Sequence, residues 1–158
     1  MAIQLHLRAG VLAARAGDRE RADEYVQAAR ELSNESDPPA VPYYNIDASR
    51  LNIDVHWCAV PVEAYDGTES VRRAERVQVH DPQRPERIGH HHVDQARAWL
   101  LHGDRKQALA HLNAARRVAA DRIRYHPQVH ATVRALADTD ARVTDSLARF
   151  ARWAGVPV

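Results

Sequence analysis

The sequence is poor in cysteine, lysine, phenylalanine and glycine. Its 158 residues include one cysteine, one lysine, one phenylalanine and six glycines. A single cysteine excludes a disulfide framework and a cysteine-based zinc site within one chain, and so few glycines and phenylalanines argue against a β-sandwich. No apolar run approaches the ~20 residues of a membrane span, and no signal-peptide pattern is present. We therefore expect a soluble, cytoplasmic protein without a membrane segment.

The abundant residues favour α-helices. Apolar residues make up 45% of the sequence and charged residues 27%, which is ordinary for a globular domain. Ala, Leu, Arg and Gln dominate the regularly patterned segments, and these residues are good helix formers. The composition thus favours an all-α fold.

A helix-pair pattern occurs twice. Gly17-Asp18 separates two helical stretches near the start, and Gly103-Asp104 separates two more in the second half. In both copies the second stretch places Ala, a larger apolar residue and Ala at spacings of four and three: Ala22, Val26 and Ala29, then Ala108, Leu112 and Ala115. Such repetition is typical of stacked helical-repeat proteins, in which neighbouring units cover one another's apolar faces.

The pattern predicts tetratricopeptide-like helical hairpins stacked as a right-handed α-solenoid within one domain, residues 1–158. The predicted units span about 2–33, 43–78 and 86–119, and a capping helix pair spans about 127–154. The middle unit is degraded, because Tyr65-Asp66-Gly67 stands where the other units have Gly-Asp. Pro61 should kink or end the first helix of that unit.

Three short sequence motifs resemble those of a known protein family. They are H-x-x-D-x-A-R over His91–Arg97, R-x-H-P over Arg124–Pro127, and Asn52-x-x-x-His56. With the alanine spacing, they resemble the tetratricopeptide-like C-terminal sensor module of actinobacterial Xre-type helix-turn-helix transcriptional regulators, over nearly the whole chain. The resemblance implies a non-enzymatic sensor or protein-interaction module. In such regulators a helix-turn-helix domain precedes this module, so we expect DNA contact only through a domain that this sequence lacks.

Aligning the glycine turns predicts a binding face on the first helices of the units. Gln4, Asn52 and His90 come into register there, and Val55 and Arg97 belong to two further rows of the same alignment. Amide, imidazole, guanidinium and aliphatic groups together suit a groove for a peptide, a small molecule or a partner protein. An alternative is that Asn52 and Arg97 only tie neighbouring helices together. We also expect a homodimer, the commonest assembly. The competing hypothesis is a structural scaffold or self-association module without a small ligand.

Ten histidines, three of them consecutive at 90–92, raise the question of a metal. Adjacent helical residues point about 100° apart, so three successive histidines cannot all face one ion. His126 and His130 are spaced to share a helix face but lack an obvious third ligand. Asp94 could serve as an acid–base group, but an intrahelical ion pair with Arg97 is a simpler explanation for its position. We therefore expect no metal, no cofactor and no catalytic residues.

Charge is distributed unevenly along the chain. Residues 1–81 carry 9 basic and 14 acidic side chains, whereas residues 82–158 carry 13 basic and 7 acidic ones. The asymmetry could favour head-to-tail self-association or an acidic partner for the second half. Solvated helix faces are the simpler explanation.

Overall fold

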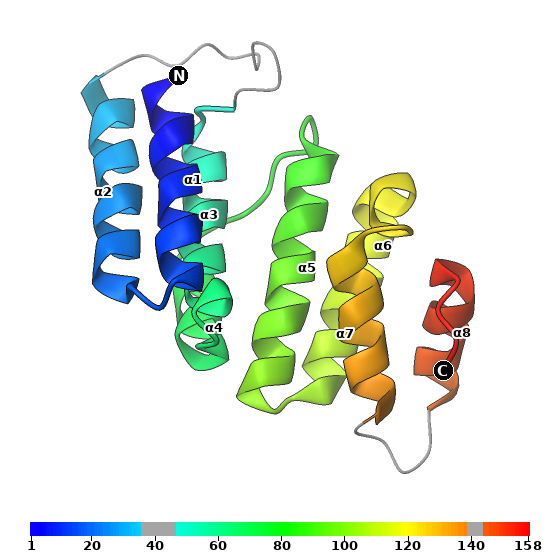
Figure 1. Ribbon diagram of the computed structural model, residues 1–158. Helices are drawn as coiled ribbons and strands as arrows, with labels where there is room; N and C mark the ends of the chain where they lie inside the picture. Colours follow the sequence, from blue (N-terminus) through cyan, green and yellow to red (C-terminus); the bar gives the residue numbers. More distant parts are fainter. Residues whose placement is uncertain (36–46, 139–143) are drawn as a thin grey trace. The chain divides into compact units, whose positions relative to one another are not determined.

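The structure is a computed structural model that describes residues 1–35, 47–138 and 144–158 (Figure 1). Over these residues the chain is helical and has no strand, which confirms the all-α prediction. No helix in the described part is long and apolar enough to cross a membrane. The helices are α1 (Ala2–Arg15), α2 (Arg19–Glu35), α3 (Arg50–Glu63), α4 (Gly67–Ala74), α5 (Pro85–His102), α6 (Arg105–Ile123), α7 (Pro127–Asp138) and α8 (Asp145–Ala154).

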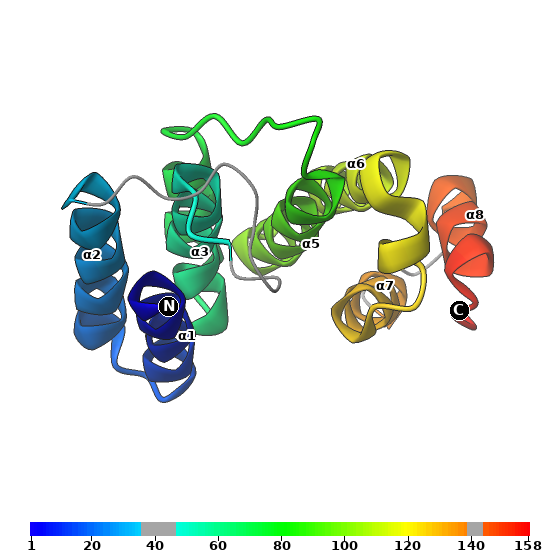
Figure 2. The same ribbon diagram turned by 90° about the horizontal axis from the view of Figure 1, so that it is seen from above.

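The chain divides into two compact units, residues 1–80 and 81–158. In unit 1, α1 and α2 form an antiparallel pair, α3 packs against both, and α4 packs on α3 (Figures 1 and 2). The core of this unit combines a few large aliphatic side chains with alanines, which let the helices approach closely. Its buried members include Ile3, Leu7, Ala14, Ala22, Val26, Ala29, Ile53 and Val60.

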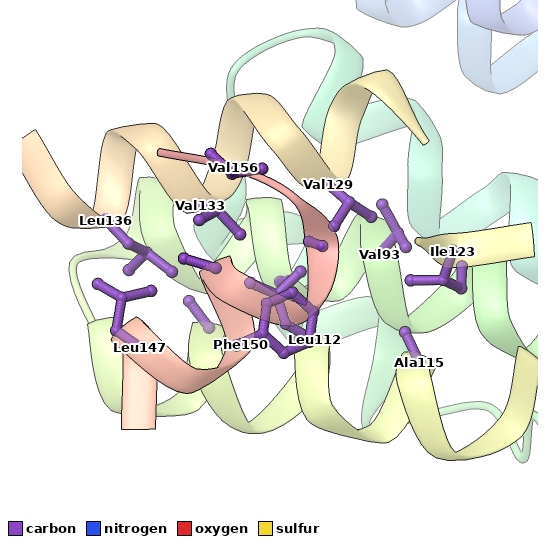
Figure 3. Close-up of a cluster of buried hydrophobic side chains, with 14 residues drawn as sticks. Val93, Leu112, Ala115, Ile123, Val129, Val133, Leu136, Leu147, Phe150 and Val156 are labelled. Atoms are coloured by element: carbon purple, nitrogen blue, oxygen red, sulfur yellow. The ribbon is translucent and has the colours of Figure 1, made fainter. Parts of the chain in front are cut away.

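Unit 2 has a larger core. α5 and α6 form an antiparallel pair, α7 packs against both, and α8 packs on α7. Figure 3 shows side chains from all four helices meeting in one cluster, with Leu112 of α6 beside Phe150 of α8. The helices of the predicted capping pair contribute to this cluster through Val129, Val133, Leu136, Leu147, Phe150 and Ala151.

The chain turns in the same way inside each helix pair. The residue at the turn has a positive φ in all three pairs: 84° at Gly17, 58° at Tyr65 and 100° at Gly103. In each turn the N–H of the next residue, an aspartate, donates to the carbonyl five residues earlier, at 2.8 to 3.0 Å. This is the Schellman pattern that satisfies the last carbonyls of a helix. Tyr65 thus occupies the position of glycine, and the middle turn keeps the common geometry.

The aspartate after each turn caps the following helix. A side-chain oxygen of Asp18, Asp66 or Asp104 accepts the N–H of the residue three positions later, at 3.0, 2.9 and 2.9 Å respectively. These bonds satisfy N–H groups that have no partner within the helix. Asp18 is therefore the N-cap of α2, and its counterparts Asp66 and Asp104 cap α4 and α6.

Arg73 of α4 joins the helices of unit 1. Its side chain is only 7% exposed, and its guanidinium donates to both carboxylate oxygens of Asp23 on α2, at 2.6 and 2.7 Å. It also donates to Glu69 Oε1 at 2.8 Å. Hydrogen bonds from Arg72 and then Arg73 lower the pKa of Glu69 to about 2. Bidentate pairs of this kind fix geometry as well as supplying energy.

The helix α3 continues through Pro61 to Glu63. Proline has no N–H, so it frees the carbonyl four residues earlier, which here belongs to Trp57. That carbonyl accepts a hydrogen bond from Arg73 Nη1 at 3.1 Å. Of the two effects predicted at Pro61, a kink or a helix end, the helix end is wrong, because α3 continues to Glu63 and a side chain from α4 supplies a donor to the freed carbonyl.

Other boundaries differ from the predicted ones by several residues. Of the predicted second unit, which begins at Tyr43, the structure describes a helix only from Arg50; residues 43–46 lie outside the described part. α4 ends at Ala74, short of the predicted end near residue 78. The last helix begins at Asp145, and residues 139–143, which fall within the predicted capping pair, lie outside the described residues.

α5 and α6 approach closely where α6 bends. Ala119 has φ −145° and ψ 53°, outside the helical range, and the helix then resumes to Ile123. At this level a Cβ on Gly89 of α5 would lie 2.8 Å from the Cβ of Ala119. The end of α6 predicted at Ala119 therefore coincides with a bend, beyond which the helix continues.

Candidate functional site

The three consecutive histidines of α5 point in different directions. The ring of His90 lies edge-on to His126, with centroids 5.1 Å apart. His92 faces α6, where its Nδ1 lies 3.1 Å from Nδ1 of His111, and His91 is buried at 7% exposure. This divergence follows from the rotation of about 100° per helical residue. Among the described residues, no group of three or more His, Cys, Asp or Glu side chains is placed to hold a metal ion.

Basic side chains gather where α5 meets the start of α7. We use the term basic face for a set in unit 2 whose members contact one another or act on one another through their charge: Arg87, His90, Arg97, Arg122, His126 and His130. Two predicted binding residues, His90 and Arg97, belong to it. They lie seven positions apart on α5, which places them on one side of the helix, two turns apart.

The start of α7 orients the imidazoles of this face. The N–H of Gln128 donates to Nδ1 of His126 at 3.3 Å, so in the neutral ring the proton resides on Nε2. His130 lies one turn later, and its Nε2 donates to the carbonyl oxygen of Arg124 at 2.8 Å. Pro127 suits the first helical position because its missing N–H would have no partner there. Nε2–H of His126 is thus left as a donor on the basic face.

The electrostatics of the basic face favour an anion. Burial lowers the pKa of His90, and the neighbouring His126 and two arginines lower it further. Burial also lowers the pKa of His126, with added effects from the charges of Arg97 and His130. Both rings are therefore uncharged at neutral pH and can donate one hydrogen bond each. Guanidinium and imidazole N–H groups are suitable partners for a carboxylate or a phosphate.

Asp94 limits what Arg97 can bind. Its Oδ1 lies 3.4 Å from Nη1 of Arg97, which is the expected ion pair at a spacing of three residues. The distance is long for a charge-assisted hydrogen bond, and the side chains are 23% and 17% exposed. An incoming anion would compete with Asp94 for the outer edge of the guanidinium.

The predicted binding residues of unit 1 are largely buried. Nδ2 of Asn52 donates to the backbone carbonyl of Asp47 at 2.6 Å and to Oε1 of Gln4 at 3.3 Å. The structure thus brings Gln4 and Asn52 together, and the amide ties α1 to the beginning of α3. Asn52 is fully buried and Val55 is 4% exposed. That these residues belong to a binding face stays a prediction.

Four members of the basic face were not predicted: Arg87, Arg122, His126 and His130. The motif R-x-H-P, which ends in His126-Pro127, was used only for the family resemblance, but it could have marked His126 as a candidate binding residue. The repeat register compared only the first helices of the units, so it could not show that the start of α7 packs beside α5. Contacts between non-equivalent helices leave no periodic pattern in a sequence.

Comparisons of this chain with models of protein families, with curated proteins and with solved structures find no match. The resemblance to the sensor module of helix-turn-helix regulators therefore stays a prediction.

Proposed function

We propose that the chain is a non-enzymatic binding module of a transcriptional regulator, and that the basic face of unit 2 recognises an anionic group on a peptide, small molecule or partner protein. The observation that carries this proposal is the gathering of imidazole and guanidinium groups from α5, α6 and α7 at one seam. The positive charge at this seam comes from Arg87 and Arg122, which act on His90 together with an opposing effect of Glu86, and from Arg97, which acts on His126. A bound anion would offset that charge.

The proposal includes a stacked arrangement. Three helix pairs would form a right-handed tetratricopeptide-like solenoid, closed by α7 and α8, and the first helices of the pairs would line its concave face. The common turn geometry and the three aspartate caps support this, because equivalent hairpins are the elements of such a stack. A homodimer would suit a regulator that binds palindromic DNA through a separate helix-turn-helix domain.

Anion recognition is tested by NMR titration of the histidine rings at constant ionic strength. The probes are inorganic phosphate and N-acetyl-dialanine with a free carboxylate, and the dialanine amide is the neutral control. We expect both anions, and not the amide, to raise the pKa of His90 and His126, because a bound anion stabilises the protonated ring. An Arg97→Gln variant should lose the effect, whereas Arg134→Gln, at an exposed position on α7, should keep it. Equal responses of the two variants would contradict the proposal.

The scaffold hypothesis has a specific observation in its favour, the burial of Asn52 between Gln4 and Asp47. We expect Asn52→Ala to lower the free energy of unfolding by about 1–3 kcal/mol, since it leaves buried acceptors without a donor. Arg97→Ala should leave the melting temperature nearly unchanged and weaken anion binding. Asn113→Ala is the control for Asn52, because among the described residues the Asn113 amide bonds only to the Leu109 carbonyl of its own helix. If Arg97→Ala changed only stability, the scaffold hypothesis would be favoured.

A further inference from the structure

α1 carries two apolar stripes on opposite sides. The first packs in the core of unit 1 against α2 and α3, which lie on one side of α1 in Figure 2, and its residues are Ile3, Leu7, Gly10 and Ala14. The second, which we call the outer stripe, lies on the opposite side because helical residues are about 100° apart. Its residues are Ala2, Leu5, Ala9, Leu12 and Ala16. Leu5 is 61% exposed and Leu12 64% exposed, so the outer stripe is open to solvent.

The outer stripe has the spacing of a coiled-coil seam. Its residues follow one another in steps of three and four, with alanine and leucine in alternation. This pattern fills both seam positions of two successive heptads. The leucines can act as knobs, and the alanines leave holes into which a facing helix inserts its own side chains. The occupant with the matching shape is therefore another amphipathic α-helix laid along α1.

The charge beside the outer stripe selects the kind of helix. α1 contains no acidic residue, although residues 1–81 carry 14 acidic and 9 basic side chains. Arg8 lies beside the stripe, is exposed, and makes no hydrogen bond or ion pair with another described residue. Arg15 lies on the same edge but is paired with Glu63 of α3. The guanidinium of Arg8 is thus the group that an acidic side chain of the occupant would meet.

We propose that the outer stripe of α1 docks an amphipathic helix of a partner protein, with large apolar side chains on its seam and acidic residues along its edge. A second copy of this chain fits less well, because two facing α1 helices would bring arginines together without an acidic residue. A membrane surface does not require the regular spacing of the stripe. The docking surface lies in unit 1 and does not depend on the basic face, and the homodimer proposed above would use another surface.

The probe is a synthetic peptide of three heptads with leucine at both seam positions, glutamate at both flanking positions, and alanine or glutamine elsewhere. A matched peptide has lysine in place of every glutamate. Each is titrated into the 158-residue chain and followed by backbone amide NMR shifts. We expect saturable shifts at Leu5, Ala9 and Leu12, and about three- to fivefold tighter binding of the acidic peptide. The absence of saturable shifts at these residues would overturn the proposal.

Reversing one charge tests the choice of partner. Arg8→Glu should reverse the preference, so that the basic peptide binds about three- to fivefold more tightly than the acidic one. Arg76→Glu, at an exposed position of the same unit outside α1, should leave the preference unchanged. If Arg8→Glu and Arg76→Glu have the same effect, the acidic edge of the partner has no counterpart on α1 and the proposal is wrong.

A leucine variant tests the apolar seam. Combining Leu5→Gln with Leu12→Gln should weaken the binding of both peptides by about tenfold or more. Both side chains are exposed, so the melting temperature should remain nearly unchanged. Leu101→Gln is the control, because Leu101 is a 46% exposed leucine on α5, and it should bind as the unchanged chain does. Unaltered binding in the double variant would reject the seam.

Three further outcomes would assign a different role to these groups. If the acidic peptide shifts His90 and His126 instead of α1, it binds the basic face, which supports the first proposal and rejects this one. If the unchanged chain sediments as a dimer that the double leucine variant abolishes, a second copy covers the stripe. If the chain binds phosphatidylglycerol vesicles through Leu5 and Leu12 and binds neither peptide, the stripe contacts a membrane.

Discussion

At the scale of single residues, Tyr65 has a backbone conformation that the other two hairpin turns give to glycine. Its φ is 58°, in the left-handed region where the Cβ of an L-residue crowds the following carbonyl. Its side chain is 82% exposed, so little packing is gained in return. The turn is held by its backbone hydrogen bonds and by the Asp66 cap despite this steric cost.

Replacing Tyr65 by glycine should therefore stabilise the chain. The steric cost released is about 1–2 kcal/mol, and the extra conformational entropy of glycine in the unfolded chain offsets about 0.5–1 kcal/mol of it. We expect a net increase of about 0.5–1 kcal/mol in the unfolding free energy, measured by urea denaturation. Gly103→Ala, at the equivalent position with φ 100°, should lower it by about 1 kcal/mol. A decrease in both variants would contradict this account of the turn.

At the scale of elements, α5 packs against two other helices of unit 2, α6 and α7, and the two contact seams differ. One seam faces α6 and contains His92, His111 and the close approach of Gly89 to Ala119. The other faces α7 and carries part of the basic face. The seam with α6 has little free space, and the seam with α7 carries several basic groups. Small substitutions on α5 should therefore change the stability of unit 2 appreciably.

Gly89→Ala should destabilise the protein although alanine is the better helix former. The gain in helix propensity is about 1 kcal/mol, whereas a Cβ placed 2.8 Å from another Cβ forces the helices apart, at a cost of about 1–3 kcal/mol. We expect a net loss in unfolding free energy by urea denaturation. Combining Gly89→Ala with Ala119→Gly moves the methyl group to the other helix and should recover part of that loss. No recovery would mean that the bend itself, and not the contact, is sensitive.

Acid should destabilise unit 2 through its buried histidines. Burial lowers the pKa of His91 to about 3 and of His111 to about 4, with His92 adding to both effects. The unfolded chain binds these protons near pH 6.5, so between pH 6.5 and about 4 it holds more protons than the folded state and stability falls as pH falls. Each ring should cost roughly 1.4 kcal/mol per pH unit in that window.

The measurement is urea denaturation between pH 7.5 and 4. His111→Gln should make the curve of unfolding free energy against pH shallower, whereas His80→Gln, at an exposed position in unit 1, should not change its slope. A slope that is the same in all three proteins would show that acid sensitivity arises elsewhere.

At the scale of the whole molecule, the two units have cores of different size. Within the described residues, the core cluster of unit 1 has eight buried members, three of them alanine. That of unit 2 has fourteen, five of them alanine, and its large side chains include Leu112, Ile123, Leu136, Leu147 and Phe150. Burying one such side chain contributes about 1.5–3 kcal/mol, and alanine contributes much less.

Unit 2 should therefore be the more stable unit. We expect the slowest amide hydrogen exchange in α5 and α6, and faster exchange in α1 and α2, because amides exchange through the cheapest opening that exposes them. Leu112→Ala should accelerate exchange in α5 and α6 and leave the rates of α1 unchanged. Equal protection of α2 and α6 in the unchanged chain would show that the two units open together.

Sequence reasoning predicted the parts of the fold that depend on local signals. The aspartate after each turn and the Ala-apolar-Ala spacing are encoded within a few residues, and helices form on both sides of each predicted turn, although several of their boundaries differ from the predicted ones. Pro61 failed as a stop signal because its effect is cancelled by Arg73, twelve residues later and on another helix. A pattern based on one helix cannot contain that information.

In the candidate site, too, local spacing could be predicted from the sequence and tertiary contacts could not. His90 and Arg97 were placed on one side of a helix by spacing alone, and the structure agrees with that placement. Their companion His126 arrives through the packing of α7 against α5, which depends on side-chain fit between helices. Asn52 was predicted from the same register, yet its amide lies buried against Gln4. Register identifies which side of a helix a residue occupies, and tertiary packing decides whether that side is open.

The shared turn has a consequence for how copies of a repeat can be recognised. The three turns have one set of backbone hydrogen bonds but two kinds of residue at the position of positive φ. A comparison by amino-acid type scores Tyr65 as a mismatch and finds two good copies. A comparison by torsion angle treats the three turns as equivalent. In this chain the three turns therefore share a backbone torsion angle that their amino-acid types alone do not reveal.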